Sequence, residues 1–208
     1  LQHIDHTLLK AYATWEDIKT LCDEAMKNKT ASVCIPQTYI KRVKDIYPSL
    51  NVCTVIGFPL GYNSTKSKIV EAENAIEDGA SEIDMVINIS DVKNGDYKKV
   101  EDEIKALRKT CQGKILKVII ETCYLTDDEK IEMCKAVTNA KADYIKTSTG
   151  FGTDGAKIKD VLLFKKHLGD SVKIKASGGI KSKEELVGFI EAGCNRIGTS
   201  SAVKMLIK

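Results

Sequence analysis

The chain has 208 residues, 43% of them hydrophobic, and its 32 basic and 29 acidic residues give a formal net charge of +3 at pH 7. That length is enough for one sizeable core, and the interspersed charges, without a basic block, argue against nucleic acid or a membrane surface as a partner. No apolar run reaches the length of a membrane span, and no signal peptide is visible at Leu1, so we expect a cytoplasmic protein.

Short runs rich in valine and isoleucine alternate along the chain with longer stretches of helical periodicity. This alternation is typical of βα units built on a parallel sheet. In chain order, each predicted strand with the helix after it, the elements are 4–9 and 14–28, 31–35 and 36–47, 51–57 and 64–78, 81–88 and 97–111, 114–121 and 126–141, 142–146 and 156–167, 172–176 and 182–192, and 194–198 and 200–207.

Three of the predicted helices begin with an N-cap residue that is followed three positions later by an acidic residue. These capping-box pairs satisfy the free backbone donors of a first helical turn. Glycines at positions 79 and 193 end two of the helices. The three pairs are Thr14 with Asp17, Thr126 with Glu129, and Ser182 with Glu185.

Eight strands, each followed by a helix, predict a single α/β domain over residues 1–208 that folds as a (β/α)8 TIM barrel. The alternative is an open doubly wound sheet. Two observations disfavour it, because no GxGxxG motif follows the first strand and no linker or shift in composition marks a second domain. In a barrel, functional side chains collect at the carboxyl ends of the strands, so chemistry is expected there.

Seven cysteines give an odd count, and no two of them form a CxxC pair. Most lie inside apolar segments, as in the run Val33-Cys34-Ile35. This pattern is typical of buried, reduced thiols and does not favour disulfides or a zinc site. The seven positions are Cys22, Cys34, Cys53, Cys111, Cys123, Cys134 and Cys194.

The predicted strand 142–146 ends in Lys146, and the chain then continues with hydroxyl residues and Gly150. Desolvation disfavours an ammonium group at such a buried position and lowers its pKa. A neutral amine can attack a carbonyl carbon, so Lys146 is a candidate nucleophile. The alternative is a lysine whose side chain reaches solvent from the strand end.

Further charged residues occupy the ends of neighbouring strands. Asp84 lies between apolar residues and needs a partner for its charge, and Lys175 is preferred over Lys173 because it is nearer the strand end. Two adjacent lysines lower each other's pKa, and a carboxylate beside them can move protons. Lys117 and Glu121 are interpreted as a supporting pair on one face of their strand. The alternative is a structural cluster of ion pairs inside the barrel.

Two loops predict a phosphate site. Ser177, Gly178 and Gly179 follow the seventh strand, and the run 198–201, with Gly198, Thr199, Ser200 and Ser201, follows the eighth. Loops at these two places form the recurrent phosphate site of such barrels, where backbone N–H groups, hydroxyls and a helix dipole meet the anion. No arginine or lysine falls within either loop. Ordinary turn glycines and an N-cap serine are the alternative interpretation.

A catalytic metal is not expected. The chain has three histidines, His3 and His6 at the first strand and His167 at the end of a helix, and these make a poor ligand set. We therefore expect neither a metal nor another cofactor.

At these residues the chain resembles the deoxyribose-phosphate aldolase family. The matching runs follow one another along nearly the whole chain, and the motifs around Lys146 and Lys175 are together specific to this family among barrels. The runs are IDHTLL (4–9), VCIP (33–36), VIGFPLG (55–61), EIDMVIN (82–88), KVIIET (117–122), YIKTSTGF (144–151) and KASGGI (175–180).

The resemblance implies a carbon–carbon lyase of the aldehyde-lyase class, which cleaves 2-deoxy-D-ribose 5-phosphate reversibly to D-glyceraldehyde 3-phosphate and acetaldehyde in deoxyribonucleotide catabolism. It implies a class I mechanism without metal. By motif match, Lys146 is similar to the Schiff-base lysine, Lys175 to the second lysine that perturbs it, and Asp84 to an acid/base partner working through a water. The implied substrate-binding residues are Asp5, Thr149, Gly150, Gly178, Gly179, Gly198, Ser200 and Ser201.

Two other functions remain open from the residues alone. A phosphosugar isomerase or epimerase on the same barrel would use Asp84 as a base with no covalent step. A non-catalytic barrel would bind sugar phosphates and use its lysines only to hold the anion. An interaction scaffold is less favoured, because no exposed apolar stripe or charged tail is evident. The resemblance implies a phosphosugar substrate and a homodimer or homotetramer, and the sequence does not choose between these two assemblies.

Overall fold

The structure, a computed structural model, describes residues 1–206 and is a closed barrel of eight parallel strands. The strands pair in chain order, and β8 pairs with β1 beside Asp5 and Gly198, so the sheet closes on itself. The predicted (β/α)8 barrel is confirmed. The strands are β1 (Ile4–Thr7), β2 (Ser32–Cys34), β3 (Val52–Ile56), β4 (Glu82–Val86), β5 (Ile115–Ile119), β6 (Tyr144–Lys146), β7 (Lys173–Ser177) and β8 (Arg196–Thr199).

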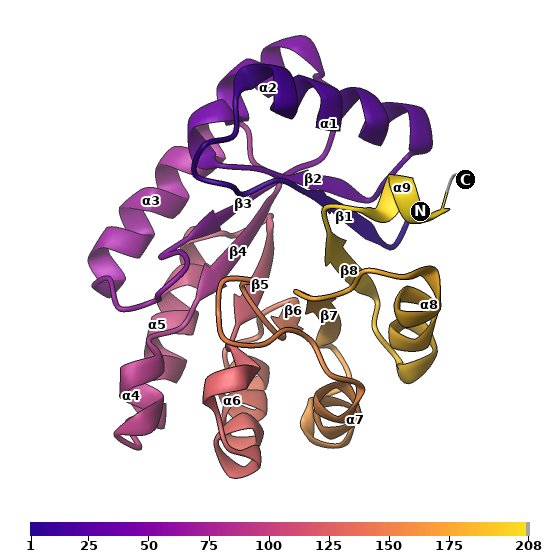
Figure 1. Cartoon of the computed structure of the whole chain (residues 1–208). Coiled ribbons are helices and arrows are strands. Elements are labelled where there is room, and N and C mark those ends of the chain that lie inside the picture. Colours follow the sequence, from indigo (N-terminus) through magenta and orange to yellow (C-terminus); the bar gives the residue numbers. More distant parts are fainter. Residues whose placement is uncertain (207–208) are drawn as a thin grey trace.

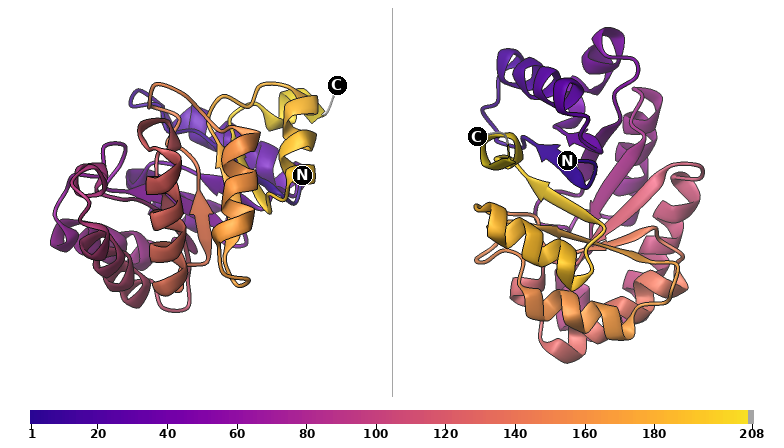
Figure 2. Two further views of the ribbon diagram at one scale, coloured as in Figure 1. Left: turned by 90° about the horizontal axis from the view of Figure 1, so that it is seen from below. Right: turned by 90° about the vertical axis from the view of Figure 1, so that its right-hand side faces the viewer.

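Helices surround the barrel, as Figure 1 and Figure 2 show. Because every strand runs in the same direction, all eight carboxyl ends open at one end of the barrel. Two 3-10 helices, η1 (Gln37–Tyr39) and η2 (Thr122–Tyr124), lie in the loops. The α-helices are α1 (Trp15–Asn28), α2 (Ile40–Ile46), α3 (Thr65–Glu77), α4 (Ile89–Lys93), α5 (Tyr97–Thr110), α6 (Asp127–Asn139), α7 (Ile158–His167), α8 (Lys183–Ala192) and α9 (Ala202–Leu206).

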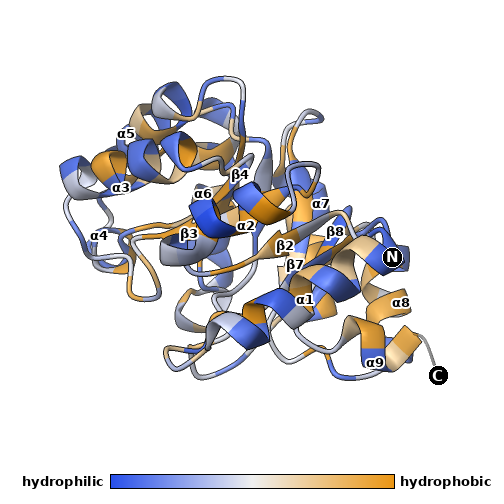
Figure 3. Cartoon of the chain, turned by 90° about the horizontal axis from the view of Figure 1, so that it is seen from above, coloured by the Kyte–Doolittle hydropathy of each residue, from blue (hydrophilic) through white to orange (hydrophobic). Residues whose placement is uncertain are grey.

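The main apolar core lies between the strands and the inward faces of the helices. Helix α1 buries Ile18, Leu21, Cys22 and Ala25, whose spacing places them on one helical face. Strand β3 is buried along its whole length, as expected for a parallel strand covered on both faces. Figure 3 shows apolar residues concentrated on the strands, whereas the helices carry both polar and apolar residues.

The predicted helix starts are confirmed where capping chemistry is strong. The side chain of each predicted N-cap residue accepts a hydrogen bond from the backbone three positions on, and each acidic partner accepts one in return. Gly193 ends α8 in a left-handed conformation, as Gly79 does directly after the C-cap of α3. The three confirmed capping boxes start at Thr14, Thr126 and Ser182.

Other boundaries differ from the predictions. The short helix α4 was not predicted, and it begins where the side chain of Asn88 caps the N–H of Ser90, at the end of what was predicted as a strand. Strand β5 ends at Ile119 rather than at residue 121, because Glu121 adopts a left-handed conformation with φ +49°. The predicted last helix reached residue 207, which lies outside the described residues.

The cysteines agree with the prediction of reduced thiols. All seven are free, and all but Cys123 are buried. Cys34 and Cys53 are register partners on the neighbouring strands β2 and β3, where they pack with Val55.

Within residues 1–206, the helices are too short or too polar to span a bilayer.

Gly61 provides a test of the loop that follows β3. Its φ is +74°, and a Cβ atom added there would lie 1.9 Å from the carbonyl oxygen of Ile87. The substitution G61A is therefore expected to lower the free energy of unfolding by about 3 kcal/mol or more, since left-handed strain and a backbone overlap add together. Urea unfolding measures this loss.

Gly95 is the matched control, because its φ is +78° but nothing lies within 4 Å of an added Cβ. The substitution G95A is expected to cost only the left-handed strain, about 1–2 kcal/mol. Equal losses for G61A and G95A would show that the contact with Ile87 does not constrain the loop.

Candidate active site

A buried carboxylate joins three lysines inside the barrel. Asp84 on β4 is 0% exposed. Its Oδ2 accepts hydrogen bonds from the Nζ atoms of Lys146 (2.8 Å) and Lys175 (2.7 Å), and its Oδ1 accepts one from Lys117 (2.8 Å). These side chains come from β4, β5, β6 and β7, so the structure brings together the charged residues that the strand ends predicted.

Electrostatics fix the charge of two of these groups. Burial alone would raise the pKa of Asp84, but the ammonium groups of Lys117, Lys146 and Lys175 outweigh it and hold that pKa well below its ordinary value. Burial would likewise lower the pKa of Lys175, but the carboxylates of Asp5 and Asp84 outweigh it and raise that pKa. Asp84 is therefore an anion and Lys175 a cation at neutral pH.

The raised pKa of Lys175 corrects one expectation. The sequence predicted two neighbouring lysines that lower each other's pKa, and for Lys175 the net shift has the opposite sign. The reason is Asp5, whose carboxylate forms an ion pair with Lys175 and is fully buried beside it. Asp5 was expected to bind substrate, and its role as the counterion of Lys175 was not predicted.

Lys117 and Glu121 do not form the supporting pair that their spacing suggested. Lys117 lies inside the barrel against Asp84 and Glu82, whereas Glu121 lies beyond the end of β5. The carboxylate of Glu121 accepts hydrogen bonds from the hydroxyl and the backbone N–H of Thr149. Burial raises the pKa of Glu121, and those hydrogen bonds partly oppose the increase. Glu121 thus anchors the loop after β6.

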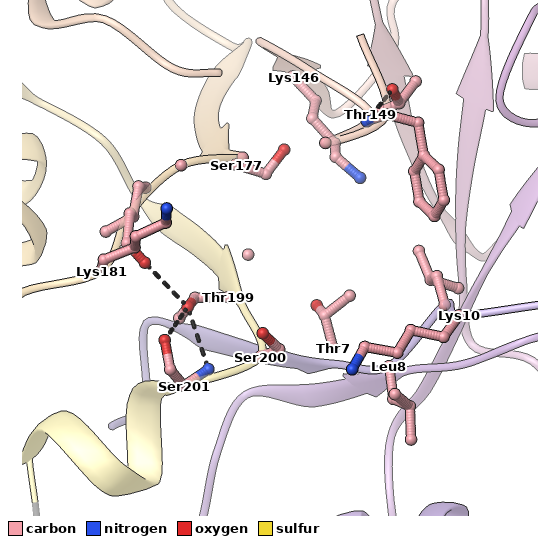
Figure 4. Close-up of a pocket in the computed structure, with 17 residues that line it drawn as sticks. Thr7, Leu8, Lys10, Lys146, Thr149, Ser177, Lys181, Thr199, Ser200 and Ser201 are labelled. Carbon is pink, nitrogen blue, oxygen red and sulfur yellow. Dashed lines mark hydrogen bonds between the residues drawn. The ribbon is translucent and has the colours of Figure 1, made fainter. Parts of the chain in front are cut away.

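A cavity of about 260 Å³ opens at the carboxyl ends of β1, β6, β7 and β8. Within the buried cluster around Asp84, Lys146 alone lines this cavity, and this residue is 3% exposed. Figure 4 shows its amine directed into the cavity, across from Thr7 and Ser200. Asp5, Asp84 and Lys175 are buried and are not among its lining residues.

The predicted loops form the opposite part of the cavity. Its lining includes seven of the residues expected to bind substrate, namely Thr149, Gly150, Gly178, Gly179, Gly198, Ser200 and Ser201. Gly178 and Gly179 have φ values of +83° and +77°, a conformation that favours glycine. Gly198 has a different reason to be glycine, because an added Cβ would lie 3.2 Å from Cε of Lys175.

Two cations in the cavity lining were missed. Lys10 follows β1, and Lys181 follows the glycines after β7. The absence of a lysine from the two predicted loops is correct, but Lys181 lies just two residues beyond Gly179 and reaches the same cavity. Its backbone N–H donates to Glu185, the acidic residue of the α8 capping box (2.7 Å). Extending the loop to the start of α8 would have found it.

The remaining candidates lie elsewhere. Lys173 is exposed at the beginning of β7, with its ammonium 5.8 Å from the ring centroid of Tyr144. Among the histidines, His6 contacts Glu24 at 2.7 Å, and His3 contacts the carbonyl of Asn195 at 2.9 Å. Neither histidine lines the cavity.

One group in residues 1–206 has metal-ligand geometry. The thiols of Cys34 and Cys53 and the carboxylate of Asp84 place their ligand atoms within 4.8 Å of one another. Three ammonium groups already contact Asp84, from Lys117, Lys146 and Lys175. A cation there would be repelled by these positive charges, so this group is a poor metal site.

Comparisons with known proteins agree with this geometry. A family model described as "DeoC/LacD family aldolase" matches residues 1–200. A Clostridium botulinum protein named deoxyribose-phosphate aldolase is 63% identical over 207 residues, which cover 99% of this chain and 94% of the relative. A Clostridioides difficile protein of the same name is 57% identical with the same coverage of each chain.

Two solved structures show the same fold. A putative deoxyribose-phosphate aldolase from Coccidioides immitis superposes with a TM-score of 0.95 at 42% identity, covering 98% of this chain and 83% of that one. A structure described as a tetrameric deoxyribose phosphate aldolase from Aeropyrum pernix gives a TM-score of 0.93 at 34% identity, covering 99% and 88%. The chain belongs to the DeoC/LacD family of aldolases.

Proposed function

We propose that this protein is a class I deoxyribose-phosphate aldolase, which cleaves 2-deoxy-D-ribose 5-phosphate to D-glyceraldehyde 3-phosphate and acetaldehyde through a Schiff base on Lys146. One observation carries the proposal. Lys146 is the member of the buried cluster whose amine enters the cavity, and it is held there by Asp84. The relatives' names supply the substrate. The whole barrel serves as one catalytic domain.

In the proposed reaction, the ammonium group of Lys146 first loses a proton to solvent. The resulting amine adds to the aldehyde carbon C1 of the open-chain sugar, and loss of water gives an iminium ion. The C2–C3 bond then breaks, and its electron pair moves toward the iminium nitrogen to form an enamine. The C3 hydroxyl loses its proton and becomes the aldehyde of glyceraldehyde 3-phosphate. Protonation of the enamine at C2, followed by hydrolysis, releases acetaldehyde and frees Lys146. The iminium ion is the electron sink, so no metal is required.

Asp84 and Lys175 take part in the proton transfers of this reaction. Oδ2 of Asp84 accepts hydrogen bonds from both Lys146 and Lys175, so one carboxylate oxygen lies between the nucleophile and a fixed cation. In this assignment Asp84 acts through a water as the acid/base partner, and Asp5 keeps Lys175 charged.

The phosphate occupies the side of the cavity formed by the loops after β7 and β8. Gly178 and Gly179 allow the backbone to approach the anion closely, and Ser200 and Ser201 add hydroxyl groups. Lys181 adds a positive charge at the same side. A charge-assisted hydrogen bond from its ammonium group strengthens phosphate binding.

The substitution K181M is expected to raise KM for deoxyribose 5-phosphate about 10-fold, the effect of losing one hydrogen bond to a charged group, with little change in kcat. Cleavage of unphosphorylated deoxyribose should be unaffected, because it has no anion to bind. Steady-state kinetics on both sugars measure this difference. K183M is the matched control, since Lys183 is an exposed lysine two residues away that does not line the cavity. Equal effects of K181M on both sugars would remove Lys181 from the phosphate site.

The decisive experiment for the function is to incubate the protein with deoxyribose 5-phosphate, add borohydride, and locate the adduct by mass spectrometry. A reduced adduct on Lys146 is expected. An adduct on Lys175 or Lys173 would keep the aldolase but overturn the assigned roles. Binding without any adduct would favour the non-covalent isomerase or the binding barrel.

We further propose a homo-oligomer. The Aeropyrum pernix relative, at 34% identity to this chain, is described as a tetramer. Light scattering distinguishes a tetramer from the alternative homodimer.

A further inference from the structure

Arg196, the first residue of β8, lies inside the barrel at the end opposite the cavity. A first series of contacts connects its guanidinium to Asp84 through residues of β4 and β5. Nη2 of Arg196 contacts Oε2 of Glu82 at 2.7 Å, and that oxygen contacts Nζ of Lys117 at 2.5 Å. Lys117 then donates to Oδ1 of Asp84 at 2.8 Å. A continuous series of ion pairs thus connects Arg196 to Asp84.

A second series leaves the same guanidinium through β1 and β7. Nε of Arg196 donates to Oδ1 of Asp5 at 2.7 Å, and the hydroxyl of Ser32 donates to that same oxygen at 2.8 Å. The other carboxylate oxygen of Asp5 forms the ion pair with Lys175. Lys175 donates to Oδ2 of Asp84 at 2.7 Å. Both series therefore end on the same carboxylate.

Together the two series form a closed ring in which positive and negative groups alternate. The ring has three cations and three carboxylates, so it carries no net charge. Each member is 9% exposed or less. Lys146 contacts the ring at Asp84 from outside it. We call these six residues the charge ring: Asp5, Glu82, Asp84, Lys117, Lys175 and Arg196.

A charge ring is an unusual filling for a barrel. Barrel interiors of this fold are generally packed with branched apolar side chains, and buried ion pairs seldom stabilise a protein more than apolar packing would. Stability alone therefore does not explain the presence of the charge ring. Arg196 is suited to its place because its planar guanidinium contacts two carboxylates through separate nitrogen atoms, Asp5 through Nε and Glu82 through Nη2.

We infer that Arg196 and Glu82 are positioning residues, which hold Lys175 and Asp84 in the geometry and charge state that the chemistry on Lys146 requires. Neither residue lines the cavity, so both act through other side chains. Arg196 acts through Asp5 on Lys175, and Glu82 acts through Lys117 on Asp84. The inference rests on the proposed imine chemistry of Lys146.

The charge ring makes a prediction that packing alone does not make. R196M leaves the ring with a net charge of −1, which makes every nearby group bind protons more readily. E82Q leaves it with +1 and has the opposite effect. The titratable and charged groups that face the two central carboxylates, Asp84 and Asp5, from all packed strands are Lys117, Lys146, Lys175, Arg196, Cys34 and Cys53.

The test measures kcat as a function of pH for each variant, with deoxyribose 5-phosphate at saturation. The profile is expected to move up by about one pH unit for R196M and down by about one unit for E82Q. In both variants kcat at its optimum should fall about 10- to 100-fold through misplacement of Lys175 or Asp84, with KM unchanged. Exchange of deuterium into the methyl group of acetaldehyde should slow in parallel, since it uses the same proton transfers.

Two further variants control for structure. R196K keeps the charge but not the planar fork, so its profile should stay at the wild-type pH while kcat falls. S32A removes a neutral contact of Asp5 and should leave the profile in place. R196M leaves two buried carboxylates without their shared cation and is the variant most exposed to misfolding, in which case E82Q and R196K carry the test.

Opposite pH shifts for R196M and E82Q, with none for R196K, would support the inference. Unshifted profiles in folded variants, or losses of kcat that simply follow losses of thermal stability, would overturn it and reduce the charge ring to packing. The wild-type protein is first trapped with borohydride. If no lysine gives an adduct, the proposed function fails and the inference with it. An adduct on a lysine other than Lys146 keeps the aldolase but overturns the inference, and an adduct on Lys146 with unshifted profiles refutes the inference alone.

Discussion

Replacing Lys146 with leucine is expected to lower kcat for deoxyribose 5-phosphate cleavage about 10⁴- to 10⁶-fold, while the barrel remains folded. The loss is large because removal of a covalent nucleophile abolishes the reaction path through the imine. Folding should be preserved, because the charge ring is neutral without Lys146 and the substitution removes one surplus buried cation. Steady-state kinetics and urea unfolding of K146L measure the two effects.

The matched control for K146L is K173L. Lys173 is also a strand lysine, but it is exposed at the opposite end of β7 from the cavity. Its replacement should leave both kcat and the borohydride adduct unchanged. A K146L variant that retained wild-type turnover would refute the assignment of the nucleophile, and loss of activity in K173L would shift attention to the other lysine.

Replacing Asp84 with asparagine is expected to damage both stability and chemistry. Asparagine keeps the size of the side chain but removes the charge that three buried lysines share, Lys117, Lys146 and Lys175. Removing one partner of a buried ion pair costs about 3–5 kcal/mol. Among the molecules that remain folded, loss of an acid/base group should lower kcat about 10²- to 10⁴-fold.

Urea unfolding gives the stability of D84N, and borohydride trapping in native buffer counts the folded molecules with a reactive amine. D102N is the control, since Asp102 forms an exposed ion pair with Lys98 on α5 and should tolerate the change. K146L and D84N thus differ in the sign of the charge removed, and only D84N should unfold more easily. A stable D84N with wild-type kcat would leave Asp84 without a role in proton transfer.

The barrel could be predicted because its signals are local. Each βα unit carries its own valine- and isoleucine-rich strand, and capping boxes such as those at Thr126 and Ser182 mark where helices begin. Strand ends were harder to place. The predicted fifth strand continued to Glu121, where the backbone becomes left-handed, and no residue pattern around a non-glycine residue announces that change.

The candidate active site and the residues that support it could be predicted only in part. Lys146, Lys175 and Asp84 each stand out as a charge at the end of an apolar strand, which is a local signal. Arg196 and Glu82 begin their strands, at the end where chemistry was not expected, and they were missed. Arg196 and Glu82 reach Asp84 only through Asp5 and Lys117. These residues lie on four different strands, and their spacing in the sequence does not show that their side chains meet inside the closed barrel.

The closure of the barrel by β8 has a consequence for how the protein is made. Asp5 and its partner Arg196 are separated by 191 positions, so Arg196 leaves the ribosome long after Asp5. Until β8 is added, Asp5 and Glu82 lack a cation that they share in a dry interior. The pairing of β8 with β1 therefore closes the barrel and completes the charge ring in the same late step of folding. A chain that ends before β8 already holds Lys146, Lys175 and Asp84, yet it has no stable interior in which to keep them.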